Sequence, residues 1–311
     1  MKKTLYILPL IVLLAASCEK TIPIDDNGDH SLVLNGLLSA DERAFVYFAQ
    51  TRFFLDSSYN QPVDGANITL YVNGAAYQPD SMSRSKYFFP YRLQEGDNLS
   101  IDISAPRNQV HAETYVPYFP AVSNPQVGRF ASPSFNFYLA NLQLDDHAAI
   151  DEYYRVVVTK RDSGARYNDW TAEIDTVDTI RNTFFLVPYN PEITSSQVQA
   201  YAPLGGYLYS TLMFTDKLMA GQTSNLQLYI IQTVDTNEIA PFKHEYFIDI
   251  ESITPARWNY IVSASQQNSM TSFFSEQGEA WSNVDGAFGI FAGLAKRHYA
   301  FDPDTLQTVT P

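Results

Sequence analysis

The sequence predicts an all-β protein built from two sandwich-like domains, and three observations support this. Polar and apolar residues alternate with period two over many short segments after Ser31, as in strands with one buried face. Turn residues such as Asn73-Gly74 separate these segments. The chain also holds 21 Tyr and 20 Phe, which favour strands. Its 311 residues, 45% of them apolar, suffice for one large or two ordinary domains.

The N-terminus has the pattern of a lipoprotein signal peptide over residues 1–17. Two lysines precede an apolar run, Leu5 to Ala16, which is shorter than the ~20 residues that a spanning helix needs. Small residues then lead to Cys18, the only cysteine, at the position where a lipobox requires a thiol. We therefore expect lipidation at Cys18 and an outer-membrane protein, on the cell-surface or the periplasmic face. An ordinary secretory signal followed by a chance cysteine is the alternative.

The predicted mature chain is strongly acidic. Without Lys2 and Lys3 it keeps 18 basic residues against 34 acidic ones, a net charge of −16. Such a body repels nucleic acid and anionic lipid head groups, whereas cationic ligands and basic partner surfaces stay possible. Residues 18–30 read as a lipidated acidic tether. With Cys18 acylated no disulfide can form, so the fold depends on its core alone.

Residues 31–117 are predicted to form an immunoglobulin-like or fibronectin-like sandwich. Asn73-Gly74 and Glu95 to Asn98 are its clearest turns. The proline-rich stretch from Val116 to Pro125 is expected to end the domain. The predicted strands are Ser31–Leu38, Ala44–Leu55, Ala66–Val72, Tyr87–Leu93, Leu99–Ala105 and Val110–Val116.

Residues 118–311 are predicted to form a second β domain with one short helix at about 254–267. Thr254 is a suitable N-cap, Pro255 suits the first helical position, and Trp258 begins an apolar face. A strand from Phe288 to Gly293 is expected to close the domain. The other predicted strands are Phe135–Leu144, Tyr153–Lys160, Thr171–Asp178, Thr183–Pro188, Tyr207–Phe214, Asn225–Val234 and Glu245–Ser252.

Several segments resemble a family of Bacteroidota lipoproteins known as domain of unknown function 4249. The clearest is Ser282 to Phe291, which is similar to the family's ending of asparagine, then glycine, then G-x-F. Phe214-Thr215-Asp216 with Gly221 resembles its central F-[ST]-D…G hairpin. Leu32–Gly36 and Ala66–Leu70 resemble its V-x-N-G and A-x-V-x-L strands. The resemblance implies a surface or periplasmic lipoprotein, often encoded near TonB-dependent outer-membrane transporters, and supplies no catalytic residue.

No catalytic residue, metal ligand or cofactor site is predicted. The five histidines lie far apart in the sequence, and none has the spacing of a paired ligand. Asp145-Asp146-His147 is the most metal-like cluster, but adjacent residues on a strand point to opposite faces, which favours a turn. The many carboxylates leave room for a hidden acid–base pair.

Asn283, Gly286, Gly289 and Phe291 are predicted to have a structural role, in which the glycines permit a tight turn and close backbone packing. The dense aromatic stretches Tyr87–Tyr91 and Tyr115–Phe119 have two interpretations. They can fill the cores and the seam between domains, or they can form an interface or a sugar platform. The core interpretation is favoured.

Four Asp-[Ser/Thr]-apolar triplets match a pattern at which secreted Bacteroidota proteins are often O-glycosylated. Ordinary turns at strand ends are the alternative. The hydroxyl-bearing residues are Ser81, Thr176, Thr179 and Thr305.

These observations favour a non-enzymatic binding or accessory lipoprotein that works with a TonB-dependent transporter in nutrient uptake. The ligand would be a small molecule, a glycan or a peptide. A surface glycan or peptide hydrolase with paired carboxylates is the main alternative, and a structural or adhesin role is another. A cleft with two carboxylates ~5–10 Å apart would favour the hydrolase.

Overall fold

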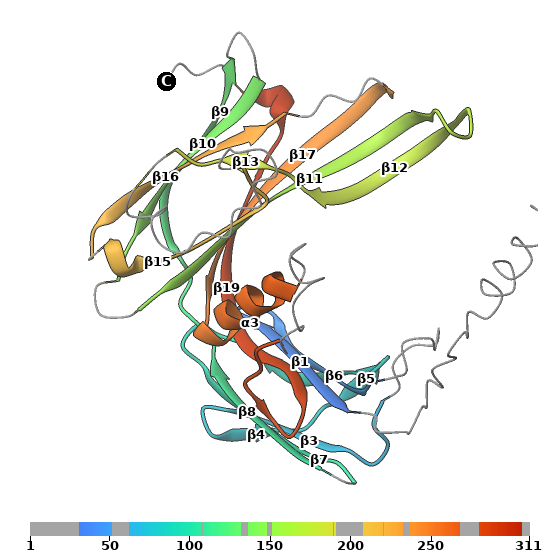
Figure 1. Cartoon of the computed structure of the whole chain (residues 1–311), viewed down its shortest axis with the longest axis vertical. Coiled ribbons are helices and arrows are strands. Elements are labelled where there is room, and N and C mark those ends of the chain that lie inside the picture. Colours follow the sequence, from blue (N-terminus) through green and yellow to red (C-terminus); the bar gives the residue numbers. More distant parts are fainter. Residues whose placement is uncertain are drawn as a thin grey trace, which may run out of the picture.

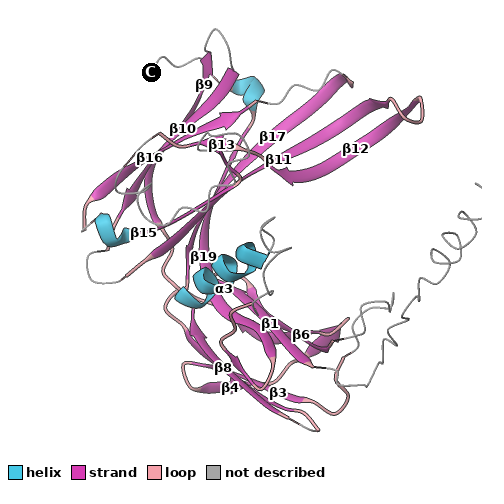
Figure 2. Ribbon diagram, viewed as in Figure 1, coloured by secondary structure: helices cyan, strands magenta, loops and turns pink. Residues whose placement is uncertain are grey.

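The computed structural model describes residues 31–51, 62–106, 108–131, 136–147, 151–188, 190, 208–219, 221–232, 237–267 and 280–306. The prediction of an all-β chain in two sandwiches is confirmed: two β bodies lie one above the other, and a single α-helix, α3 (Pro255–Gln267), lies beside their junction in the described part of the chain (Figures 1 and 2). No helix in these ranges is long and apolar enough to cross a bilayer. The signal peptide and tether lie outside the described residues.

The first sandwich packs two sheets around one apolar core. One layer has the strand order β19-β1-β2-β6-β5 and the other β18-β8-β7-β3-β4. Alternate residues such as Leu34, Phe48 and Ile101 are fully buried between the layers, as the period-two pattern requires. The strands are β1 (Leu32–Ser39), β2 (Arg43–Gln50), β3 (Asn67–Val72), β4 (Ala75–Tyr77), β5 (Ser81–Ser83), β6 (Lys86–Arg92), β7 (Asn98–Ser104), β8 (Gln109–Tyr115), β18 (Val284–Asp285) and β19 (Phe288–Phe301).

The second sandwich has its own core. One layer has the order β12-β11-β17-β19, with β15 also paired to β11, and the other has the order β14-β13-β16-β10-β9. Tyr154, Phe185 and Ile248 are among the residues buried between them. The strands are β9 (Ala121–Ala131), β10 (Asn136–Asp145), β11 (Tyr153–Asn168), β12 (Glu173–Asn182), β13 (Phe185–Leu186), β14 (Leu208–Tyr209), β15 (Thr211–Thr215), β16 (Thr223–Ile231), β17 (Glu238–Ile253) and β19.

Strand β19 belongs to both sandwiches. Its first half pairs in parallel with β1, and its second half pairs antiparallel with β17. Phe291 and Ala295 of β19 are buried in the first core, as is Val284 of the neighbouring β18. The continuous range 118–311 that the sequence suggests for the second domain differs from the structure here. A parallel partner for β1 must come from a distant part of the chain, and alternation within one segment does not reveal it.

Helix α3 forms where the capping residues predict it. The Thr254 hydroxyl accepts a hydrogen bond from the backbone N–H of Arg257 at 3.5 Å, and Pro255 takes the first helical position. Trp258 packs against Ile253 and Leu294 in a small apolar cluster where the two sandwiches meet. The helix thus covers the junction.

Three differences from the predicted strands have local causes. Strand β9 runs through Pro125, although the sequence suggests that this stretch ends a domain; an edge strand tolerates proline because one side of it needs no donor. Strands β11, β17 and β19 are longer than expected because their ends are mostly half-buried or exposed and lose the alternating pattern. The short strands β4 and β5 were not predicted. They are largely exposed and carry almost no apolar alternation.

Candidate functional site

Three neighbouring strands of the second sandwich, β9, β10 and β16, present amide side chains on their outer face. Cross-strand register places Asn141 opposite Gln126 on one side and opposite Gln227 on the other. The same face carries Gln143 opposite Asn225, while a bulge in β9 brings Asn124 beside them. These residues line a hollow of about 540 Å³. We call this surface the amide face, and its members are Asn124, Gln126, Asn141, Gln143, Asn225 and Gln227.

Most hydrogen-bonding groups of the amide face lack protein partners among the described residues. Only Asn124 and Gln143 bond to each other, with the Nδ2 of Asn124 donating to Oε1 of Gln143 at 2.5 Å. The Oδ1 of Asn141 is buried and accepts no hydrogen bond from any described residue. A buried amide oxygen without a partner costs about 1–3 kcal/mol, which a bound donor would recover.

An aromatic pair adjoins the amide face along the same strands. Tyr229 lies two residues beyond Gln227 on β16 and therefore faces the same way. Its ring meets that of Phe137 edge-on, with centroids 6.2 Å apart. No charged residue is among those that line the hollow. The site therefore combines neutral donors and acceptors with a neighbouring aromatic surface.

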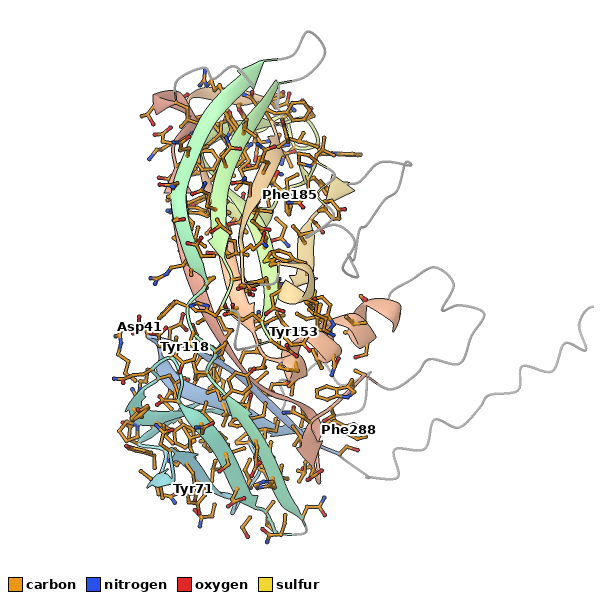
Figure 3. The ribbon with its side chains drawn as sticks, turned by 90° about the vertical axis from the view of Figure 1, so that its left-hand side faces the viewer. Asp41, Tyr71, Tyr118, Tyr153, Phe185 and Phe288 are labelled. Atoms are coloured by element: carbon orange, nitrogen blue, oxygen red, sulfur yellow. The ribbon has the colours of Figure 1, made fainter. Side chains whose placement is uncertain are left out.

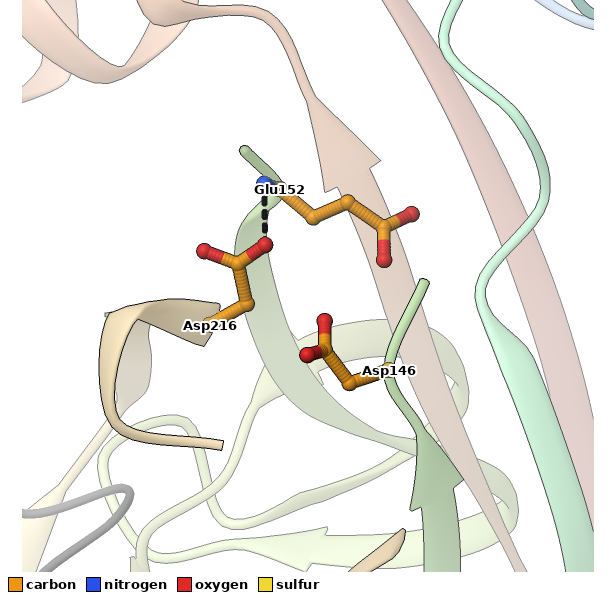
Figure 4. A group of neighbouring side chains, drawn as sticks. All are labelled: Asp146, Glu152 and Asp216. Atoms are coloured by element: carbon orange, nitrogen blue, oxygen red, sulfur yellow. Dashed lines mark hydrogen bonds between the residues drawn. The ribbon is translucent and has the colours of Figure 1, made fainter. Parts of the chain in front are cut away.

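Three carboxylates from separate segments meet at the end of the second sandwich near the junction (Figure 4). Asp146, Glu152 and Asp216 each place a carboxylate oxygen within 4.8 Å of the others. Glu152 and Asp216 are each 7% exposed. The side chains of the predicted turn Asp145-Asp146-His147 have different partners. Asp145 accepts a hydrogen bond from the Thr223 hydroxyl, whereas Asp146 belongs to the cluster and His147 Nδ1 lies 3.2 Å from Glu152.

Each carboxylate of this cluster is held by a protein donor. Asp216 accepts from the backbone N–H of Glu152 at 2.6 Å, and Glu152 accepts from the Tyr154 hydroxyl at 2.6 Å. Asp146 accepts from the N–H of Gly221 at 2.5 Å. Asp216 and Gly221 are the residues of the F-[ST]-D…G segment, so that motif builds the cluster. Oxygens at this spacing suit a hard cation, but one oxygen of each carboxylate already accepts a hydrogen bond from the protein. We therefore assign no metal here.

Burial raises the pKa of Asp216 to about 6, helped by the negative charges of Asp146 and Glu152 and opposed by the Glu152 N–H. Protonation thus favours the folded state. The stabilising contribution is fully present below the carboxyl's ordinary pKa and is lost as pH rises through about 6.

Asp216→Asn is therefore expected to raise the free energy of unfolding at pH 7.5 by about 1–3 kcal/mol, because it removes a buried charge and keeps an acceptor for the Glu152 N–H. The gain should vanish near pH 4, which urea unfolding at both pH values measures. Glu113→Gln, at an exposed carboxylate, is the control and should change the free energy of unfolding at pH 7.5 much less than Asp216→Asn does. An equal effect of Asp216→Asn at both pH values would contradict the assignment.

A smaller pocket of about 170 Å³ lies at the seam between the sandwiches, and its lining includes Tyr115, Tyr118, Tyr153 and Glu152. Figure 3 shows Tyr118 and Tyr153 at this junction. Burial, with Tyr153 and Glu152 nearby, raises the pKa of the Tyr115 hydroxyl. Within the predicted aromatic stretch Tyr115–Phe119, Phe119 packs against the first core, whereas Tyr115 and Tyr118 line this pocket.

The predicted structural residues near the C-terminus cluster between β1 and β8. The Asn283 side chain donates to the carbonyl of Phe291 at 2.7 Å and accepts from its N–H at 3.0 Å. It also donates to the carbonyl of Glu113 at 3.2 Å. The Asn283 side chain therefore makes the two hydrogen bonds to Phe291 that a neighbouring strand would make, and it connects β19 to β8.

The glycines of this segment lie against backbone carbonyls. A Cβ on Gly286 would be 2.1 Å from the Gln109 oxygen, and one on Gly289 would be 2.1 Å from the Leu34 oxygen. Gly36 is register partner to Phe291, and a Cβ there would be 2.7 Å from the Phe291 ring. The V-x-N-G and C-terminal motifs thus meet in space.

The remaining predicted positions are surface positions or lie outside the described ranges. Cys18 is not among the described residues. The four candidate O-glycosylation residues, Ser81, Thr176, Thr179 and Thr305, are all exposed. Glycosylation and lipidation remain predictions.

Sequence reasoning missed the amide face and the full carboxylate cluster. The amide face has a recognisable signal: Asn or Gln recurs at alternate positions in three strands, at 124 and 126, 141 and 143, and 225 and 227. The carboxylate cluster has none, because its members lie on three segments that only the fold brings together.

Comparisons with solved structures find chains of low similarity. One from Bacteroides uniformis ATCC 8492, provisionally described as a carbohydrate-binding protein, is 7% identical, with 88% of this chain and 100% of that chain covered and a TM-score of 0.25. The major pilin subunit BcpA of Bacillus cereus, as its D312A variant, is 13% identical over 72% of this chain and 64% of its own, with a TM-score of 0.22. Beta-glucuronidase 3 of Bacteroides uniformis is 10% identical over 70% and 23%, with a TM-score of 0.18. Scores this low do not define a common function. No protein with a curated description matches the sequence.

The motifs that meet in the structure are those by which the sequence resembles a known family. A family model described as domain of unknown function (DUF4249) matches residues 19–299, which is nearly the whole chain after the predicted signal peptide. The protein therefore belongs to the DUF4249 family.

Proposed function

We propose that this protein is a lipid-anchored, non-enzymatic binding protein of the outer membrane that holds an uncharged glycan on its amide face. In this role it would present the glycan to a TonB-dependent transporter. One observation carries the ligand assignment: the hollow of about 540 Å³ is lined by six amide side chains, and no donor in the described part of the chain bonds the buried Oδ1 of Asn141.

The chemistry of the lining matches a sugar. Each amide offers two N–H donors and a carbonyl acceptor, and each sugar hydroxyl both donates and accepts. The absence of charged lining residues favours a neutral ligand, and a volume within the usual range for ligand sites accommodates one. The Phe137–Tyr229 pair offers an apolar surface against which a sugar ring can pack.

The membrane role is supported by the N-terminal sequence. The apolar run before Cys18 and the acidic tether after it would place the body a short distance from the membrane. The match to the family extends over both sandwiches, so binding is proposed as a property of the whole mature chain.

A glycan array probed with the purified acylated protein tests this proposal. We expect binding to neutral oligosaccharides. Asn141→Ala and Gln227→Ala should each weaken it by about tenfold, because each removes at least one hydrogen bond. Gln94→Ala, at an exposed glutamine in the first sandwich, should leave binding unchanged. Absence of glycan binding, or equal binding by all three variants, would refute the proposal.

The same incubations separate binding from hydrolysis. Bound oligosaccharide should be recovered intact by mass spectrometry. Cleavage that Glu152→Gln abolishes would instead favour the hydrolase hypothesis, because Glu152 belongs to the carboxylate cluster and also lines the seam pocket.

A further inference from the structure

We propose that β12 is the contact between two copies of this protein, which pair antiparallel about a two-fold axis at Val177. The interface is the free edge of the nine-stranded sheet. Strands β11 and β12 form a long hairpin that projects away from both sandwiches, with β12 outermost (Figure 1).

The β12 edge is long, regular and exposed. Its ten residues pair with β11 without a break in register. All of them are exposed except Val177, which is half-buried. The outward-facing backbone groups of such an edge are a template for another strand, and natural proteins normally protect edges of this kind.

The other edges in the described part of the structure are protected or short. Strand β9 has 11 residues, but Pro125 and a bulge interrupt it, and Asn124 has a positive φ of 49°. Strands β4, β5, β14 and β18 have three residues or fewer. Strand β15 (Thr211–Thr215), which pairs only with β11 among the described strands, has five residues, and four of them are buried. Strand β12 has neither a proline nor a bulge.

Exposed apolar side chains accompany this edge. Ile174 and Ile180 on β12 are each 65% exposed, and Trp170 at the tip of the hairpin is 97% exposed. Large apolar groups left in water on one projecting element indicate a contact surface.

The sequence of β12 is complementary to itself. When two copies pair with Val177 opposite Val177, Ile174 stands opposite Ile180. Glu173 stands opposite Arg181, and both cross-strand pairings are favourable. Glu173 has no ion pair within the described chain, and the Arg181 side chain is 54% exposed beside Asp162. The two remaining carboxylates of the strand, Asp175 and Asp178, both face threonines.

Neighbouring registers lose this match. A shift of two residues in one direction sets Ile174 opposite Asp178, and a shift in the other direction sets Asp178 against its own copy. A shift by an odd number of residues would turn each side chain to the opposite face of the sheet, so odd shifts are excluded.

The predicted glycosylation residues Thr176 and Thr179 point to opposite faces of the sheet. A sugar on either residue would therefore not block the backbone edge of β12. A second copy is thus the partner whose chemistry fits this edge, in an isologous interface.

Sedimentation and crosslinking of the full acylated protein in detergent test the proposal. We expect the wild type to sediment as a dimer of the chain. Val177→Cys should give a covalent dimer with a short bifunctional thiol reagent, because the two residues face each other. Thr179→Cys is the matched control: its two copies would lie about 13 Å apart along the strand, and it should crosslink poorly. The wild type controls for any reaction at Cys18.

Two substitutions test the complementarity itself. Ile174→Lys should raise the dimer dissociation constant at least tenfold, as should Glu173→Lys, which sets like charges opposite each other. Met82→Lys, at an exposed apolar residue on β5, should not change it. A monomeric wild type would overturn the proposal, as would a dimer that crosslinks through Thr179→Cys but not Val177→Cys, or one insensitive to Ile174→Lys.

Discussion

Gly289→Ala is expected to lower the free energy of unfolding by about 3–5 kcal/mol, with a matching drop in the denaturant midpoint. Gly289 has a φ of +118°, and the added Cβ would lie 2.1 Å from the backbone oxygen of Leu34. That oxygen belongs to the paired strand β1, so relief requires the parallel β1–β19 pairing to open. The Asn35 side chain, whose Oδ1 would lie 2.9 Å from the added Cβ, can move away, but the Leu34 backbone oxygen cannot.

Gly74→Ala separates the steric clash from backbone strain. Gly74 also has a positive φ, +84°, but a Cβ there would meet nothing within 4 Å. This control should cost about 1–2 kcal/mol from strain alone. Similar losses for the two variants would show that the contact between β1 and β19 does not constrain position 289.

The second large effect is expected at Asp162, at the base of the projecting hairpin. Asp162 and Lys160 are each 2% exposed, with Nζ and Oδ1 2.9 Å apart, and Asp162 also binds His244 and Arg181. Burial alone would raise the pKa of Asp162, but the hydrogen bonds from these groups outweigh it and lower the pKa. The network therefore stabilises the fold above the carboxyl's ordinary pKa, and this contribution is lost as pH falls through the lowered value.

Asp162→Ala should reduce the free energy of unfolding at pH 7 by about 3–5 kcal/mol, because the Lys160 ammonium stays buried without its counter-ion. Asp178→Ala removes a 59% exposed partner of Arg161 on the same hairpin and should lower the free energy of unfolding far less, because water screens an exposed ion pair. Urea unfolding at pH 7 compares the two. A loss at Asp162 no larger than that at Asp178 would mean that the buried pair has little influence on stability.

Local pattern predicts most strands of this fold but not its long-range connections. Period-two alternation locates β1, β3, β7 and β8 within about a residue, because each buries every second side chain. Thr254 and Pro255 locate α3 for an equally local reason. Local pattern does not predict the pairing of β19, because its two halves belong to different sandwiches and its parallel partner β1 lies at the other end of the described chain.

The candidate sites show the same limit. Adjacent residues Asp145, Asp146 and His147 form the most metal-like cluster in the sequence, yet in the structure Asp145 bonds Thr223, and only Asp146 and His147 approach Glu152. The amide face could have been predicted if the strand order were known, because alternate amides on three neighbouring strands share one face of the sheet. Strand order supplies that knowledge, and a single sequence does not encode it locally.

Hydrogen–deuterium exchange with and without a neutral oligosaccharide selected from the array tests the central claim most directly. The account predicts slower exchange upon binding in peptides that cover β9, β10 and β16, where the amide face lies, with the effect lost in Asn141→Ala. Protection confined to the seam around Tyr115, Tyr118 and Tyr153, or an unchanged pattern in Asn141→Ala, would contradict it.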